Sequence, residues 1–282
     1  LKKKKKKKKI KNLSYHKLDI YNLSAINKLI KKNKPNLIFY YAGQSSPAKS
    51  FYQKQETYRS NYLGCKNFLN IIKKNKIDCK FVNTSSCEIY GNLKDKINIS
   101  STKKPINPYG WAKLKSFEIT KKFRDEHNIK SYNAIIFNTE SIFRDKKFLI
   151  PKICFAAINA KKYNQKTKFG NLKVSREWNW GPEQVFYLLK FLRKEPQDFI
   201  LSNGKSYSAI SMLKYAFEYF DLNYKKYISS NDKIFLRQKD ILKKKSNWRD
   251  CLKRNKIVRK NETFGKKLII KLIKHYLKND FA

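Results

Sequence analysis

Two short stretches contain the residues best suited to chemistry. In Pro108-Tyr-Gly-Trp-Ala-Lys113, Tyr109 and Lys113 stand four residues apart, so on a helix both side chains leave the same face. A Lys ammonium beside a phenol stabilises the phenolate, which lowers the pKa of the phenol and gives an acid/base that works near neutral pH. The other stretch, Asn83-Thr-Ser-Ser-Cys-Glu88, supplies hydroxyl groups and one carboxylate. Together these groups suit proton transfer at a sugar carbon, whereas the Tyr-x-x-x-Lys spacing alone also fits a solvated helix face in a lysine-rich chain.

The flanking residues predict how both stretches are positioned. Asn107 is a good helix cap and Pro108 fits the first helical position, which predicts a helix from Pro108 to about Asn128. Cys79-Lys-Phe-Val-Asn83 predicts a strand that ends just before the hydroxyl-rich loop. The near-continuous apolar run 36–42 ends at Gly43, as a strand buried on both faces does.

Strands and helices alternate along the chain to about residue 150. Strands are predicted at 36–42, from 79 and at 132–137, and helices at 24–34, 57–75 and 108–128. This order indicates parallel strands with crossover helices, that is, an α/β fold with a doubly wound parallel sheet. The polar segments 43–46, 85–88 and 138–140 each follow a strand and should converge at the carboxyl edge of the sheet, where such folds bind ligands.

Three regions are expected. Residues 1–9 are a disordered poly-Lys tail, which we interpret as the edge of an incomplete or frame-shifted reading frame rather than as a basic interaction tail. Residues 10–150 form the alternating region. In residues 151–282 the alternation weakens to helices at 151–162, from 182, at 208–220 and at 263–278, with a short strand at 198–202. This half is expected to be a smaller substrate-binding region over the sheet edge.

The composition narrows the class of protein. The chain has 282 residues, 41% of them hydrophobic, which is typical of a globular protein. Its formal net charge of +45 comes mostly from Lys, spread among Asn and Ile, which indicates a codon bias toward A and T. We therefore expect salt-dependent, non-specific attraction to phosphates and no specific nucleic-acid partner.

Metal, membrane and disulfide roles are not expected. Five Cys are scattered with no Cys-x-x-Cys, and three His show no metal-ligand spacing. No apolar run approaches the ~18 residues that span a bilayer. These features predict a cytoplasmic protein without a metal site or a membrane partner.

The motifs together resemble the extended short-chain dehydrogenase/reductase superfamily and, within it, the GDP-mannose 4,6-dehydratase family. The Tyr–Lys pair is shared by the whole superfamily, whereas the segments after Phe137 and from Arg176 are more specific. The matching segments are Ala42-Gly-Gln-Ser45, Ser86-Cys-Glu-Ile-Tyr-Gly91, Phe137-Asn-Thr-Glu-Ser141, Leu149-Ile-Pro-Lys-Ile153, Gly170-Asn-Leu172 and Arg176-Glu-Trp178.

The resemblance implies an internal redox cycle that uses NADP and converts GDP-mannose, or a related nucleotide sugar, to its 4-keto-6-deoxy form. Tyr109 would deprotonate the C4 hydroxyl, and Lys113 would lower its pKa and hold the nicotinamide ribose. Glu88 would remove the C5 proton and protonate the departing C6 hydroxyl, while Ser86 would bind the C4 oxygen. A carboxylate in a dry pocket has a raised pKa and can both take and give a proton.

The resemblance also assigns binding residues and an assembly. Besides Tyr109 and Lys113, the cofactor side would comprise Asp19, Ile20, Tyr41, Ala42, Gly43, Gln44, Ser45, Thr139 and Arg144. The sugar nucleotide would be bound by Asn138, Lys152 and Arg176. A complete family member is expected to be a homo-oligomer.

The sequence departs from the family at several places. The superfamily opens with a strand, a Gly-x-x-Gly-x-x-Gly turn and a helix that holds the pyrophosphate, whereas the first Gly here is Gly43. The Rossmann-like sheet is therefore expected to be incomplete at the N-terminus, entering at its third strand with Asp19 at the end of that strand. An unpaired strand edge should then lie beside Leu37 to Tyr41. Single-residue departures are Thr139 for His, Ile142 for Pro, Cys87 for Ser and Ser86 for Thr.

Other functions stay open on this reasoning. Glu88 favours a dehydratase over an epimerase or a 4-reductase, but nucleotide-sugar decarboxylases can carry a carboxylate there too. The missing phosphate turn also allows a non-catalytic nucleotide-sugar-binding remnant or scaffold. Poor binding of NADP is expected for the chain as given, because the turn that holds the pyrophosphate is missing.

Overall fold

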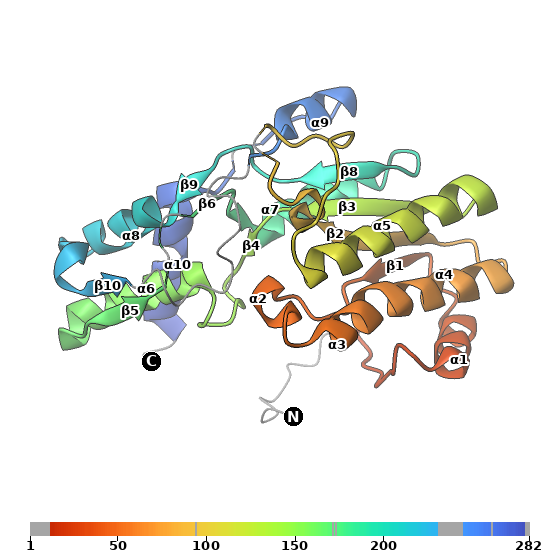
Figure 1. Ribbon diagram of the computed structural model, residues 1–282, viewed down its shortest axis with the longest axis horizontal. Coiled ribbons are helices and arrows are strands. Elements are labelled where there is room, and N and C mark those ends of the chain that lie inside the picture. The colour runs from red at the N-terminus through yellow and green to blue at the C-terminus, as the bar shows by residue number, and fades with distance from the viewer. Residues whose placement is uncertain are drawn as a thin grey trace.

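The computed structural model describes residues 12–93, 95–170, 172, 174–230, 245–260 and 262–279. The predicted tail at residues 1–9 lies outside this part of the chain. Figure 1 shows two neighbouring regions, one built on a parallel sheet and one mostly helical. The helical region contains the C-terminal helix of the described chain.

The main sheet has four parallel strands in the order β1-β2-β3-β8. Register is set by pairs such as Tyr40 with Asn83 and Asn83 with Asn133. The strands are β1 (Leu37–Tyr40), β2 (Lys80–Ser86), β3 (Ser131–Ile136) and β8 (Asp198–Leu201). This confirms the doubly wound parallel sheet expected from the sequence.

Helices cover both faces of this sheet. Neighbouring residues of a strand point to opposite faces, and in β1 Ile38 packs with α4 while Leu37 joins the cluster that contains α7. The helices and turns of this region are α1 (Leu23–Asn33), α2 (Pro47–Ser50), α3 (Lys54–Tyr58), the π-helical turn η1 (Arg59–Leu63), α4 (Gly64–Lys74), the 3₁₀ turn η2 (Cys87–Tyr90), α5 (Pro108–His127), α7 (Gly181–Phe191) and α9 (Trp248–Arg254).

The second region has its own hydrophobic core. Helices α6, α8 and α10 pack on one another around Ile153, Met212 and Leu272, which are fully buried. Its elements are α6 (Leu149–Tyr163), β5 (Thr167–Phe169), α8 (Ala209–Glu218), the 3₁₀ turn η3 (Tyr224–Lys226), β10 (Ile228–Ser230) and α10 (Gly265–Asn279).

Short strand pairs lie between the two regions (Figure 1). β4 pairs in parallel with β7, and β6 pairs antiparallel with β9. These elements are β4 (Thr139–Glu140), β6 (Ser175–Arg176), β7 (Asn179–Trp180) and β9 (Tyr207–Ser208). They hold the segments that follow β3 close to the segment that contains Arg176.

Three features differ from the sequence-based expectations. The predicted helix 57–75 is interrupted by the π turn η1. The strand at Asp198, expected in the C-terminal region, joins the main sheet instead, because it pairs with β3 at long sequence separation. The strand expected to end at Asp19 is wrong, since residues 13–19 have no regular secondary structure and pair with no described strand.

The expected sheet edge at β1 is confirmed within the described chain, where β1 pairs with β2 alone. Phe39 and the adjoining Tyr41 are partly exposed there. Among the described residues, no helix is both long enough and apolar enough to cross a bilayer.

Candidate active site

The N-terminus of α5 and the loop after β2 meet at Asn107. The Asn107 side-chain oxygen accepts a hydrogen bond from the Gly110 N–H (2.8 Å), which caps the helix as predicted. Its amide donates to Glu88 Oε2 (3.0 Å). A Cβ on Gly110 would lie 2.7 Å from the Glu88 carbonyl oxygen, so the helix and the loop approach closely because this residue is Gly. One side chain therefore joins the carboxylate to the helix that carries Tyr109.

The structure brings Ser86, Glu88, Tyr109 and Lys113 together in one buried site. Ser86 ends β2, and its hydroxyl accepts from the Glu88 N–H (3.2 Å). A side-chain hydrogen bond also joins Tyr109 to Ser86. The hydroxyl, the phenol and the carboxylate thus share one small volume, which suits proton transfer.

The pKa of Tyr109 differs from the sequence-based expectation. Burial raises it, the hydrogen bond with Ser86 and the Arg144 cation lower it, and the Glu88 carboxylate raises it further, so the net direction is upward. Lys113 Nζ lies 5.8 Å from the Tyr109 ring centroid and donates to the Thr84 carbonyl oxygen (2.7 Å) instead of the phenol. The expected lowering of the phenol pKa by Lys113 is therefore wrong for this structure.

Lys113 is itself strongly affected by its surroundings. Burial lowers its pKa from 10.5 to about 8, so the ammonium loses its proton far more readily than an exposed Lys. The residue is 6% exposed. Its hydrogen bond to the Thr84 carbonyl oxygen fixes the side chain between α5 and β2.

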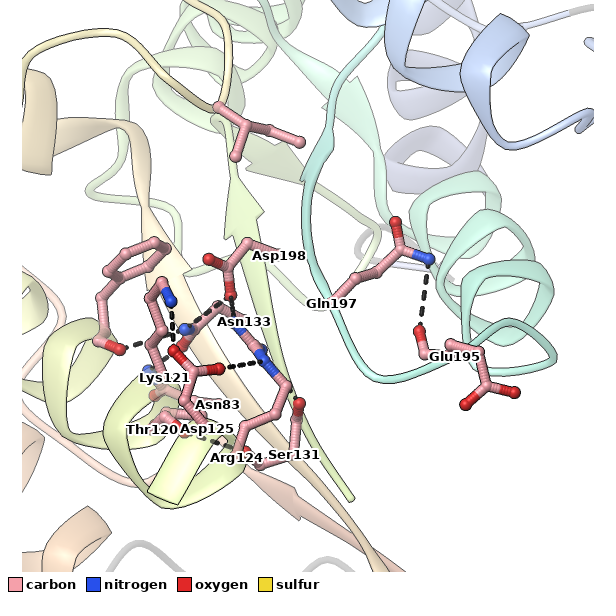
Figure 2. A network of polar contacts seen from close by, with 12 residues as sticks. Asn83, Thr120, Lys121, Arg124, Asp125, Ser131, Asn133, Glu195, Gln197 and Asp198 are labelled. Carbon is pink, nitrogen blue, oxygen red and sulfur yellow. Dashed lines mark hydrogen bonds and ion pairs between the residues drawn. The ribbon is translucent and has the colours of Figure 1, made fainter. Parts of the chain in front are cut away.

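A buried polar network attaches α5 to three strands of the sheet (Figure 2). Asn83 donates to Asn133 (2.9 Å), and Asn133 donates to the Phe117 carbonyl of α5 and to Asp198 of β8 (3.0 and 2.9 Å). Asp198 also accepts from Arg124 near the C-terminal end of α5 (2.8 Å). Because buried polar groups are costly without partners, this network fixes how α5 sits on the sheet and so where Tyr109 lies.

A cation-lined cavity of about 310 Å³ adjoins the ends of β3 and β6. It contains all three residues predicted for the sugar nucleotide, Asn138, Lys152 and Arg176, and also Arg144, which was predicted on the cofactor side. Lys152 donates to the Lys168 carbonyl oxygen (2.7 Å). Four cationic side chains line the cavity, namely Arg144, Lys147, Lys152 and Arg176, which suits a diphosphate.

Sequence reasoning did not single out several residues of this cavity. Glu140 is 2% exposed, and burial raises its pKa to about 7 against the lowering effect of the Arg144 cation. The nearest atoms of the pair, Glu140 Oε2 and Arg144 Nε, are 3.8 Å apart. Lys147 and Trp178 were missed as well. The sequence motifs could have indicated two of these residues. Glu140 lies in the motif segment 137–141 and Trp178 in the motif segment 176–178.

An apolar cavity of about 390 Å³ lies beside the end of β1 and the start of α7. It brings together Tyr41 and Thr139, both predicted on the cofactor side, with Trp180 and Val185. Thr139 donates to Gln184 Oε1 (2.6 Å), which leaves a mostly apolar wall.

The other predicted cofactor residues lie along the loop after β1 and before α1. The Gly43 backbone has φ +141°, and the Gln44 N–H donates to Ser60 Oγ (3.1 Å). Ala42 and Ser45 belong to the same loop. The Asp19 carboxylate accepts from the Tyr21 N–H, and the Ile20 carbonyl oxygen accepts from Asn67. Of the residues predicted on the cofactor side, Tyr41 and Thr139 line the same cavity.

Several solved structures share the fold of this chain. RMD from Pseudomonas aeruginosa, solved with NADPH, matches with a TM-score of 0.83 and 17% identity over 93% of this chain and 88% of that chain. DesIV, a dTDP-glucose 4,6-dehydratase from Streptomyces venezuelae solved with NAD and TYD, matches with a TM-score of 0.81 and 14% identity over 93% and 79%. These matches show that the chain has a Rossmann-type α/β fold.

The sequence narrows this class to one family. The family model described as GDP-mannose 4,6 dehydratase matches residues 1–265, and the chain belongs to this family. GDP-mannose 4,6 dehydratase 2 of Arabidopsis thaliana is 26% identical over 79% of this chain and 61% of its own length. The Homo sapiens relative is 29% identical over 73% and 57%. The chain therefore spans little more than half the length of these relatives, and the resemblance seen in the motifs is confirmed.

Proposed function

We propose that this site acts on GDP-mannose as a 4,6-dehydratase that uses NADP. The observation that carries the proposal is the burial of Glu88 beside Ser86, tied through Asn107 to the helix of Tyr109. A carboxylate at this point gives the site a group for the C5 proton, which simple C4 oxidation does not need. Family membership and the nucleotide-sugar enzymes among the structural neighbours support the substrate class.

Each catalytic group has a distinct task in this proposal. Tyr109 accepts the proton of the C4 hydroxyl, and Ser86 binds the C4 oxygen through its hydroxyl. Glu88 removes the proton at C5 and donates it to the C6 hydroxyl, which leaves as water. After hydride adds at C6, Glu88 passes a proton from solvent back to C5, which restores the C5–H bond of the product. When bound, NADP would supply the hydride acceptor for C4 and the hydride donor for C6, with no net change in the cofactor. Because burial raises the pKa of Tyr109, the phenol must first lose its proton before it can accept one from the C4 hydroxyl.

The cation-lined cavity is proposed to hold the diphosphate of the substrate. Lys152 of α6 and Arg176 of β6 supply positive charge to this cavity. Arg144 also lines it and lies near enough to act on Tyr109. Arg176 is buried, so little water would screen its interaction with a phosphate. The apolar cavity beside Tyr41 is proposed for the nicotinamide ring, with NADP preferred over NAD in so basic a chain.

A second candidate is a nucleotide-sugar-binding protein without turnover. It is favoured by the loop after β1, which follows a sheet edge with partly exposed aromatic side chains. In this case the cation-lined cavity would bind GDP-mannose, but wild type and catalytic variants would show the same absence of product. All five cysteines are buried and none of them forms a disulfide in the described chain, which supports a reducing compartment such as the cytoplasm for either candidate.

The test compares wild type with Glu88→Gln and the matched control Glu118→Gln, whose carboxylate is half exposed on α5. GDP-mannose is supplied with a high concentration of NADP, because poor binding of NADP is expected, and the 4-keto-6-deoxy product is measured by chromatography. Wild type and Glu118→Gln should form product, whereas Glu88→Gln should lose turnover by about 10²- to 10⁴-fold and retain hydride exchange at C4. Equal turnover in all three proteins would contradict the role of Glu88, and binding without product in all three would favour the second candidate.

A further inference from the structure

The segment from β6 to β7 places alternate side chains on opposite sides. Arg176 and Trp178 line the cation-lined cavity. Glu177, between them, is fully buried and does not line it. This alternation is expected of an extended chain, in which successive side chains point in opposite directions. Glu177 is therefore an unused buried carboxylate directly behind the wall of the proposed substrate site.

Four donors from two remote segments surround the Glu177 carboxylate. Oε1 accepts from the Ser246 N–H (2.7 Å), and Oε2 accepts from Ser246 Oγ (2.7 Å) and the Gly204 N–H (3.1 Å). The Ser202 hydroxyl also donates to Oε2. All four groups donate, so the arrangement is satisfied by a carboxylate that only accepts. A neutral amide at this position would turn a donor toward other donors.

These partners connect Arg176 to distant parts of the chain. Ser202 and Gly204 directly follow β8, and Ser246 pairs with Ile97 in a parallel bridge. Asn203 adds a hydrogen bond from its amide to the Trp178 carbonyl oxygen (2.8 Å). The backbone around Glu177 is thus fixed by contacts with residues that are distant in sequence and belong to different elements.

We propose that Glu177 is a positioning residue that holds Arg176 in the wall of the cation-lined cavity, where Arg176 binds a nucleoside diphosphate. The ligand in this statement rests on the proposed function, whereas the placement of Arg176 does not. The carboxylate acts by anchoring residues 175–180 to the end of β8 and to Ser246. The Arg176 guanidinium donates a hydrogen bond from Nη1 to the Ser175 carbonyl oxygen (2.8 Å). The position of the guanidinium therefore depends on the position of residues 175–180.

A matched variant separates positioning from general stability. Glu262 is also a buried carboxylate, which accepts from Trp248 Nε1 (3.1 Å) and Arg259 Nε (2.9 Å) and lies outside the cation-lined cavity. Glu177→Gln and Glu262→Gln make the same chemical change, and both should lower the unfolding temperature. Ser246→Ala removes one donor to Glu177 and is the milder variant in case Glu177→Gln does not fold.

Two readouts are taken on each folded protein. The first is modification of Arg176 by phenylglyoxal, followed by peptide mass spectrometry, which needs no ligand. It should be at least about fivefold faster in Glu177→Gln than in wild type, because a loosened segment opens more often. The second is GDP affinity by calorimetry, which should fall at least about tenfold in Glu177→Gln and about threefold in Ser246→Ala, with no change in Glu262→Gln.

The outcomes distinguish this proposal from the proposed function. Unchanged labelling of Arg176 in both Glu177→Gln and Ser246→Ala would overturn the positioning role, as would equal acceleration in Glu262→Gln. If wild type binds no GDP but labelling still rises only in the Glu177 and Ser246 variants, the positioning role stands and the proposed substrate class fails. Loss of GDP affinity without any change in labelling would also contradict positioning.

Discussion

The loops that follow β2 and β1 are neighbours in the sheet but are held very differently. The loop after β2 is buried, and Glu88 is bound through Asn107 to the cap of α5. The loop after β1 begins at Tyr41, which is 56% exposed, and lies at the edge of the described sheet. The loop proposed for proton transfer is therefore held in place by buried contacts, whereas the loop proposed for the cofactor lies open at the edge of the described sheet.

Glycine substitutions in the two loops should show this difference most strongly. At Gly91 (φ +57°) a Cβ would lie 1.9 Å from the Lys104 backbone oxygen, so Gly91→Ala should lower the free energy of unfolding by about 2–4 kcal/mol. At Gly43 the Cβ would meet the Asn61 side chain at 2.6 Å, which can move, so about 1–2 kcal/mol is expected. Gly170→Ala meets no atom within 4 Å and is the control.

Urea denaturation of the three variants measures these losses. A larger loss for Gly43→Ala than for Gly91→Ala would reverse the comparison between the loops. A loss for Gly170→Ala above about 0.5 kcal/mol would mean that added methyl groups, rather than tight loops, cause the effect.

Ligand binding should separate the two cavities by a similar margin. Arg176→Ala removes a cation from the cation-lined cavity and should weaken GDP binding by about 30-fold, which corresponds to ~2 kcal/mol. Tyr41→Ala changes only the apolar cavity and should alter GDP affinity by less than about twofold. Calorimetric titration of both variants measures this, and comparable losses would show that GDP occupies the apolar cavity as well.

The pH dependence of stability offers a smaller effect from the same cavity. Burial raises the pKa of Glu140 from 4.5 to about 7, so the unfolded chain loses this proton first as the pH rises. The contribution of Glu140 is therefore fully present below pH 4.5 and is lost as the pH passes through about 7. We expect Glu140→Gln to be more stable relative to wild type at pH 8 than at pH 5, by on the order of 1 kcal/mol. If the stability difference between Glu140→Gln and wild type were the same at pH 5 and pH 8, Glu140 would not be held in a dry site.

Local signals predicted most of the sheet region. The apolar run before Gly43 marked β1, and Asn107 with Pro108 marked the start of α5 at the correct residue. The break of the predicted helix 57–75 by a π turn was not visible, because the amphipathic pattern continues through it. Tyr109, Lys113, Ser86 and Glu88 were brought together as predicted because each stands at the end of an element whose ends the sequence marks clearly.

Strand pairs and hydrogen-bond partners that are distant in sequence could not be predicted from local sequence patterns. Strands of two residues such as β4 and β7 carry no periodic pattern, and β8 joined the main sheet through pairing with β3, more than sixty residues away. The partners of Glu177 likewise come from Ser202 and Ser246, the latter 69 residues away. The raised pKa of Tyr109 was missed because the spacing to Lys113 says nothing of burial or of the competing Thr84 carbonyl.

The most direct test of the central claim is proton NMR of GDP-mannose with NADP and this chain in D₂O. The account predicts a new C6 methyl signal from the 4-keto-6-deoxy sugar with deuterium at C5, because Glu88 exchanges its proton with solvent. Glu88→Gln should give neither change. A methyl signal of equal intensity with Glu88→Gln, or product that retains the original C5 proton, would contradict the role given to this buried carboxylate.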